Sequence, residues 1–224
     1  MSYSGISQQA FYDLFSVFAE FFTFPDQEFC ESVRSGQVDQ QISELSQKVG
    51  YPIASELKKD APTYEEWVAL YNHCFLGARK PFAPPIESIY KQWTLDGSYQ
   101  VPFKHQKGYL MGDSAQHVRH LLQAFELELP IEYNMMPDHL SILLELLAFL
   151  VGNGFVKEAQ QFCQDHLDWL PDLYKALADL PVDSSIYLAV LNELEKALQI
   201  FACSTIDNTQ TIEYSCVTAA SELN

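Results

Sequence analysis

The sequence predicts an all-α protein, and three observations lead to this prediction. Apolar residues recur at helical spacing in successive segments, which prolines, glycines and capping residues separate. No segment alternates apolar and polar residues as a half-buried strand does. Of the 224 residues, 48% are hydrophobic, which is enough for a core that needs no disulfides or metals. We expect a compact bundle of roughly ten helices.

Helical periodicity begins near the N-terminus. Phenylalanines and a leucine recur on one face from residue 11 until Pro25 ends the pattern, and Ser7 can serve as the N-cap. The pattern repeats in residues 38–49. Thr63 followed by Glu66 is a capping box, which predicts a helix that presents the aromatic residues of positions 67–75 and closes at a glycine. Those aromatic residues are most simply part of the core.

Helices resume after a long interruption. The next helix is expected to be capped by Asp113 or Ser114. The most apolar segment follows, and we expect Pro137 to be its first helical residue and the glycines from Gly152 to end it. Its apolar residues cover a wide arc, which predicts a central, buried helix. Further helices are expected at residues 155–167, at residues 171–180 and, behind a cap at Ser184 or Ser185, up to Phe201.

The interruption is rich in proline and glycine. Most of it cannot be helical, and only Ile86 to Trp93 can form a short helix. A connection this long in a helical protein is usually functional, and its aromatic content argues against disorder. The predicted organisation is one all-helical domain at residues 1–203, made of N-terminal helices in 7–76, a functional loop at 77–112 and C-terminal helices in 113–203, followed by a polar tail at 204–224.

Composition excludes several classes of protein. Thirteen basic and 30 acidic residues give a net charge of −17, so nucleic acid is an unfavourable partner and cationic peptides are favourable ones. No run approaches the roughly 20 apolar residues of a membrane span, and no basic residue precedes an apolar core at the N-terminus. Five scattered cysteines without a CxxC pair indicate reduced thiols. We expect a cytoplasmic protein.

Two clusters could carry function. Residues 84–90 (Pro-Pro-Ile-Glu-Ser-Ile-Tyr) place a carboxylate and an aromatic ring behind a rigid proline pair, although they could simply start a helix. Residues 136–140 (Met-Pro-Asp-His-Leu) place an acid and an imidazole in the expected first turn of the apolar helix. The positive end of the helix dipole favours Asp138 there and could poise His139, but helix capping explains the same residues equally well.

A metal site is the weaker alternative. His117 and His120 lie three residues apart, with Asp113 one turn earlier, and this spacing can hold a metal ion. No HExxH motif accompanies them, so two exposed histidines on a helix are the simpler interpretation. A metal-dependent hydrolase that uses His117, His120, Asp138 and His139 remains an alternative function. Motifs for nucleophilic catalysis or phosphate binding are absent from the sequence.

Three segments in this order resemble the TorD/DmsD/NarJ family of redox-enzyme maturation chaperones. They are residues 71–77 (Tyr-Asn-His-Cys-Phe-Leu-Gly), residues 84–90 and the Pro-Asp-His at 137–139, which precedes a long apolar helix. The segments Gly-Asp-Ser at 112–114 and Asp-His-Leu at 165–167 are weaker matches. The resemblance covers about residues 8–200. It departs from the family pattern at Met136, where many members have a glutamate, and at Cys74, where leucine is usual.

The resemblance implies a cytoplasmic chaperone and not an enzyme. Such a chaperone binds the twin-arginine signal peptide and the apo form of a molybdenum oxidoreductase of the TMAO or DMSO reductase type, assists cofactor insertion and delays Tat export. No resident metal or cofactor is implied, although transient contact with the molybdopterin cofactor or a nucleotide fits the family. The binding residues implied are Tyr71, Phe75, Pro84, Pro85, Glu87, Tyr90, Pro137, Asp138 and His139.

Some properties stay open at this point. Reductases of trimethylamine oxide, dimethyl sulfoxide, nitrate or another oxyanion all fit as clients. The protein could be a monomer or a homodimer that exchanges helices through the 77–112 connection. A helical adaptor that binds folded partners but no signal peptide is a further alternative function.

Overall fold

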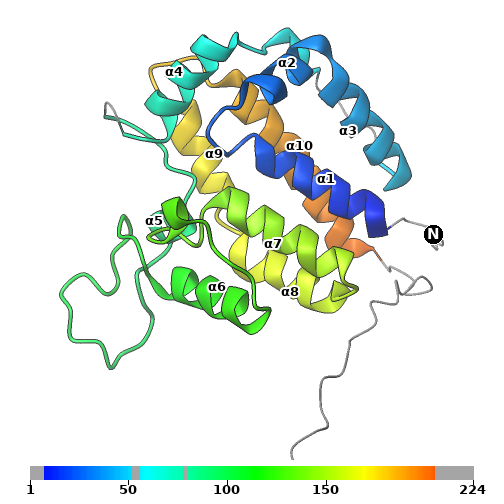
Figure 1. The fold of residues 1–224 in the computed structure, drawn as a ribbon. Helices are drawn as coiled ribbons and strands as arrows, with labels where there is room; N and C mark the ends of the chain where they lie inside the picture. The colour runs from blue at the N-terminus through cyan, green and yellow to red at the C-terminus, as the bar shows by residue number, and fades with distance from the viewer. Residues whose placement is uncertain (1–7, 52–55, 78–79, 205–224) are drawn as a thin grey trace, which may run out of the picture.

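The computed structural model describes residues 8–51, 56–77 and 80–204, and every regular element in these ranges is a helix (Figure 1). The all-α prediction is therefore confirmed. None of the described helices is both long and apolar enough to span a membrane. The elements are α1 (Gln8–Glu20), α2 (Gln27–Ser35), α3 (Gln37–Lys48), η1 (Leu57–Lys59), α4 (Tyr64–Cys74), α5 (Glu87–Tyr90), α6 (Asp113–Ala124), η2 (Ile131–Tyr133), α7 (Leu140–Gly152), α8 (Val156–His166), α9 (Leu170–Ala178) and α10 (Ser185–Cys203).

The first helix lies at the centre of the fold. In Figure 1, α1 runs beside α7 and α10, and α8 lies against α7. Phe11 and Phe15 of α1 are fully buried, and their rings lie 5.0 and 5.5 Å from the ring of Phe201 in α10. The expectation of a buried apolar helix is confirmed by α7, in which ten of 13 residues are buried. Apolar contact thus joins the N-terminal helix α1 to the C-terminal helices α7 and α10.

A second group of aromatic side chains closes the other end of the core. Trp67 donates a hydrogen bond from its indole nitrogen to the Tyr187 hydroxyl at 3.0 Å, and the Tyr187 ring lies 4.6 Å from that of Phe75. The predicted capping box is present, because Thr63 and Glu66 bond to each other's backbone. It sets the start of α4 so that its aromatic face points inward, as the sequence indicates.

Some predicted boundaries are wrong. Helix α2 was not predicted, because only Cys30 and Val33 of its nine residues are buried and few apolar residues mark it in the sequence. The helix at 113 is not capped by Asp113 or Ser114, because Gly112 occupies the N-cap position and no side chain caps it. The predicted start of α10 is correct, because Ser184 is its N-cap residue, but the Ser184 hydroxyl donates to the Leu177 carbonyl and makes no capping bond. Ser7 lies outside the described residues.

Pro137 is not the first helical residue. His139 is the N-cap of α7, and Pro137 and Asp138 precede the helix in a turn. The dipole argument for Asp138 therefore does not apply, and the carboxylate is free to bond to another element.

The connection between α5 and α6 is an ordered loop that extends away from the helices (Figure 1). Backbone bonds hold its two arms together, from Trp93 N to Gln106 O at 3.0 Å and from Thr94 N to Lys104 O at 2.8 Å. The Asp113 carboxylate closes its base by accepting bonds from the Thr94 hydroxyl and the Leu95 amide. The sequence expectation of an irregular, non-helical segment is confirmed, with α5 as its short helix.

A glycine is required at the base of this loop. A Cβ on Gly112 would lie 2.5 Å from the Trp93 carbonyl oxygen, which also accepts the Asp113 amide at 2.8 Å. We expect Gly112→Ala to destabilise the fold by about 1–3 kcal/mol, because backbone atoms must move to relieve the contact. Urea unfolding measures this loss. Gly97→Ala is the matched control, since its Cβ would meet no atom within 4 Å, and an equal loss in both variants would contradict the steric argument.

Candidate functional site

The proline loop (residues 84–90) and the Pro-Asp-His turn (residues 137–139) are joined by backbone hydrogen bonds. Ile86 and His139 form an isolated antiparallel bridge. The Glu87 amide donates to the Asp138 carbonyl at 3.1 Å, and the Leu140 amide donates to the Pro85 carbonyl at 2.8 Å. Two motifs about 50 residues apart in the sequence thus form one structural unit, and the backbone fixes their relative position.

Asp138 caps α5 from a distant part of the chain. The N-cap residue of α5 is Ile86, whose side chain cannot accept a hydrogen bond. The Asp138 carboxylate supplies the missing acceptor, because its Oδ2 lies 2.7 Å from the Ser88 amide. The Asp138 side chain is fully buried, and this burial raises the pKa of its carboxyl, with the bonds from Ser88 opposing the shift. Asp138 is therefore a structural link between the two motifs.

His139 is buried and neutral. Its Nδ1 accepts the Ser141 amide at 3.3 Å and lies 2.8 Å from the Ser141 hydroxyl. Because Nδ1 is an acceptor in the amide bond, the ring proton belongs on Nε2. Burial lowers the pKa of His139 from 6.5 to about 3. The imidazole acts as the N-cap of α7, and a charged form is strongly disfavoured in this position.

Glu87 is the buried centre of a network of titratable residues that reaches the surface. It is 0% exposed, and its Oε2 lies 2.8 Å from Nδ1 of His166, while its Oε1 lies 2.9 Å from the Lys91 ammonium. Lys91 also lies 2.6 Å from Oδ1 of Asp168 and donates to the Asp165 carbonyl. Desolvation alone would lower the pKa of Lys91, but Asp168 and Glu87 raise it above its ordinary value. Lys91 is thus held as a cation among carboxylates.

The network continues to the surface through a second histidine. Nε2 of His166 lies 2.8 Å from Nδ1 of His117 on α6. In the tautomer in which Nδ1 of His166 donates to Glu87, its Nε2 is the acceptor and His117 is the donor between the two rings. Burial and the neighbouring His166 both lower the pKa of His117. The chain of contacts therefore ties α5, α6 and α8 together.

An acidic groove opens above this network. The groove has a volume of about 660 Å³ and lies between α5, α6, the base of the 91–112 loop and the α8–α9 junction. Five carboxylate and two lysine side chains line it, together with the stacked rings of Tyr90 and Trp169, whose centroids lie 5.1 Å apart. The titratable residues of the lining are Glu87, Lys91, Lys107, Asp113, His117, Asp165, His166, Asp168 and Asp172.

The predicted binding residues do not all meet at the groove. Glu87 and Tyr90 line it, whereas Pro85, Pro137, Asp138 and His139 are buried in the unit beneath it, and Pro84 is half-buried. Tyr71 and Phe75 belong to the aromatic end of the core, and each is only 4% exposed. Their rings contact each other, with centroids 5.1 Å apart. Tyr71 and Phe75 therefore belong to the core and do not line the groove.

The residues of the alternative metal site are not brought together. His117 pairs with His166, Asp138 with Ser88, and His139 with Ser141. Within the described ranges, no group of three or more histidine, cysteine, aspartate or glutamate residues is arranged to hold a metal ion. Sequence reasoning missed the roles of Lys91, His166 and Asp168 in the groove. The Asp-His-Leu segment at 165–167 was the available signal, but its partner Glu87 lies 79 residues away.

Comparisons with known proteins agree with the motifs. Residues 35–175, more than half of the chain, match the family described as nitrate reductase delta subunit. The chain is also similar to the Chaperone protein TorD of Psychrobacter sp. (strain PRwf-1), at 27% identity over 139 residues, which are 58% of this chain and 57% of that relative. The matched part thus spans a little over half the length of the relative. The resemblance drawn from the sequence is confirmed, and the chain belongs to the nitrate reductase delta subunit family.

Proposed function

We propose that this protein is a cytoplasmic chaperone, and not an enzyme, for the maturation of a molybdenum oxidoreductase of the TMAO or DMSO reductase type. It binds the twin-arginine signal peptide and the apo form of that enzyme, assists cofactor insertion and delays Tat export until insertion is complete. The named relative is a chaperone, and family membership supports the same class of activity here. The observation that carries the proposal is the acidic groove on the joined proline loop and Pro-Asp-His turn.

The groove suits a peptide with adjacent arginines. Asp165, Asp168 and Asp172 are exposed on its α8–α9 side and can accept forked bonds from guanidinium groups. The half-buried Tyr90 ring, which stacks on the buried Trp169 ring, offers an apolar surface beside them. The strongly negative net charge of −17 steers cationic segments toward the protein. A twin-arginine signal has a basic region followed by an apolar one. The basic region fits the carboxylates of the groove, and the apolar region fits the surface at Tyr90.

Calorimetric titration with twin-arginine signal peptides from several molybdoenzymes tests this function. We expect micromolar binding to one peptide, weakened by a twin-lysine substitution and by added salt. Binding to none of the peptides would contradict the proposal and favour the adaptor that recognises only folded partners. Binding that ignores the lysine substitution would place recognition outside the groove.

A single carboxylate on the groove should matter for this binding. We expect Asp168→Asn to weaken binding of the selected peptide by about 3–10-fold, because one charge-assisted hydrogen bond becomes a neutral one. Asp60→Asn changes the net charge equally at an exposed position outside the groove and should change the affinity less than twofold. Equal losses in the two variants would mean that only long-range charge attracts the peptide.

A further inference from the structure

The acidic groove already contains two cations of the protein itself. The Lys91 ammonium lies 2.6 Å from Asp168 and 2.9 Å from Glu87, and the Lys107 ammonium lies 3.1 Å from Asp172. The side chain of Lys91 is only 26% exposed, whereas that of Lys107 is 59% exposed. The carboxylates available to a cationic ligand are therefore partly occupied before any ligand arrives.

The contact between Lys91 and Glu87 is an ion pair with poor hydrogen-bond angles. Glu87 is 0% exposed, and the Lys91 ammonium lies 2.9 Å from its Oε1 without the alignment of a well-formed hydrogen bond. A buried carboxylate oxygen with a poorly aligned donor has a higher free energy than one with a well-aligned donor. It therefore favours a cation whose donors reach Oε1 at a better angle.

A guanidinium group has the geometry that Lys91 lacks. It presents five N–H donors in a planar fork and can bond to two carboxylate oxygens at once, whereas an ammonium is a compact point charge. Exchange of one ammonium for another gains no hydrogen bonds, so a lysine ligand has no advantage over Lys91. Exchange of Lys91 for an arginine replaces the poorly aligned contact at Glu87 Oε1 with a well-aligned hydrogen bond.

We propose that Lys91 is an internal competitor for the arginine position of the groove, displaced from Glu87 and Asp168 when a guanidinium ligand binds. This inference rests on the proposed function and adds to it a residue that sets the affinity threshold. Lys91 weakens every cationic ligand by a similar factor, so that arginine ligands remain above the threshold and lysine ligands fall below it. Lys107 on Asp172 is a more exposed second cation at the same groove.

Substitutions of Lys91 test the competition. We expect Lys91→Met to tighten binding of both a capped diarginine and a capped dilysine peptide by about 10-fold, because neither must displace an internal charge. Lys91→Arg should instead weaken both, since an internal guanidinium is the stronger competitor. It also preserves the internal cation, so it decides the question if Lys91→Met does not fold. Unchanged affinity in Lys91→Met, or tighter binding in Lys91→Arg, would overturn the proposal.

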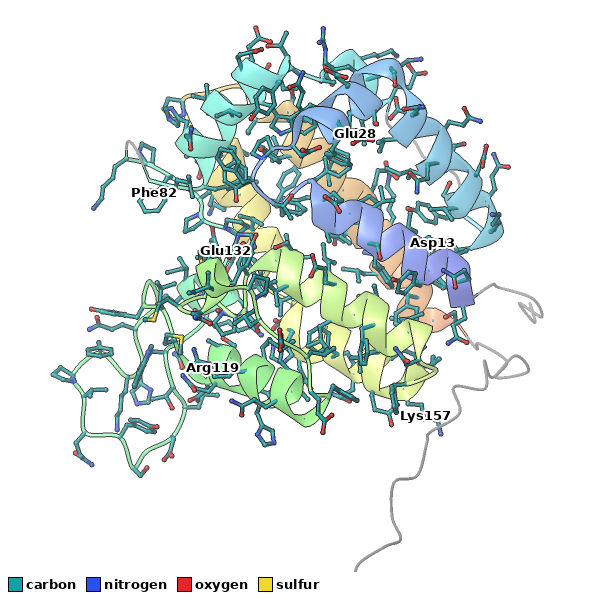
Figure 2. All side chains as sticks on the ribbon, viewed as in Figure 1. Asp13, Glu28, Phe82, Arg119, Glu132 and Lys157 are labelled. Carbon is teal, nitrogen blue, oxygen red and sulfur yellow. The ribbon has the colours of Figure 1, made fainter. Side chains whose placement is uncertain are left out.

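Lys157→Met is the matched control for net charge. Lys157 is exposed at the start of α8, at the other end of that helix from the groove residue His166 (Figure 2). Removal of its charge makes the protein as acidic as Lys91→Met does. We expect less than a twofold change for either peptide. A tightening equal to that of Lys91→Met would assign the effect to long-range attraction and overturn the competition.

Displacement can also be observed directly. A short pulse of an acylating reagent, followed by mass spectrometry, measures how accessible the Lys91 amine is. Saturating diarginine peptide should increase the Lys91 labelling rate by about 3-fold or more, because the amine leaves its two carboxylates. A fall, or no change, in the presence of bound peptide would overturn the proposal. If diarginine binds neither the wild type nor Lys91→Met, the proposal is also overturned.

The two hypotheses fail in different ways. If signal peptides do not bind but diarginine increases Lys91 labelling, the chaperone function is wrong and the competition stands. If signal peptides bind while Lys91 stays protected, the function stands and the competition is wrong.

Discussion

Replacing His139 by asparagine should make the stability of the protein less sensitive to acid. Burial lowers the pKa of His139 to about 3 in the folded state, against 6.5 for an ordinary histidine. The unfolded chain therefore binds a proton that the folded chain rejects. Above pH 6.5 His139 is neutral in both states and costs no stability. As the pH falls from 6.5 toward 3, proton binding to the unfolded chain lowers the free energy of unfolding by at most about 5 kcal/mol. Asparagine can still accept the Ser141 amide as an N-cap but does not titrate.

Urea unfolding between pH 7 and pH 4 measures this effect. The free energy of unfolding of the wild type should decrease relative to that of His139→Asn as the pH falls, so the comparison removes the contribution of groups common to both proteins. His105→Gln is the control, because His105 is exposed on the 91–112 loop and is solvated in both states. A constant difference between the wild type and His139→Asn over this range would show that His139 accepts a proton in the fold.

Replacing Asp138 by alanine should cost about 2–4 kcal/mol of stability, because the Ser88 amide loses its buried acceptor and α5 loses its cap. Thermal and urea unfolding measure the loss. The groove depends on the position of α5, so the affinity for the signal peptide should decrease together with the stability. An intact melting transition with lost affinity would instead mean that Asp138 contacts the ligand directly.

Asp138→Asn separates the hydrogen bond from the charge. Asparagine retains an acceptor for Ser88, so its loss of stability should be smaller than that of alanine. Burial raises the pKa of Asp138 above its ordinary 3.8, so folding binds a proton there. The advantage of the wild type over Asp138→Asn should therefore be largest below pH 3.8 and decline as the pH rises through the raised pKa. The opposite slope would contradict the assigned direction.

The sequence predicted most of the helices because their apolar periodicity and caps are local properties. The Thr63–Glu66 capping box and the buried α7 are the clearest cases. The helix α2 was missed because it buries only two residues, so its burial signal is weak. Its N-cap residue, Asp26, directly follows Pro25. Pro25 was expected to end the first helix, and the cap that begins the next helix beside it was overlooked.

The site was predicted less completely because its contacts are not local. The sequence identified Glu87, Asp138 and His139 as unusual, but it placed Asp138 in a helical first turn, where its loss would be worth only about 1 kcal/mol. The structure makes Asp138 a buried link to Ser88 instead. The i,i+4 spacing relates Glu87 to Lys91. No spacing rule connects this pair with His166 and Asp168, since helix packing alone brings His166 to Glu87.

The packing of α1 against α7 and α10 has a consequence for synthesis on the ribosome. The N-terminus emerges first, yet the apolar face of α1 meets Phe201 only after nearly all of α10 has been translated. The groove is also incomplete until α9 has been translated, because its lining residue Asp172 belongs to that helix. Under the proposed function, a nascent chain cannot bind a client before translation reaches the C-terminal helices. Until then its own phenylalanine face requires protection from aggregation, so a protein proposed to guard another depends on the same kind of protection while it is made.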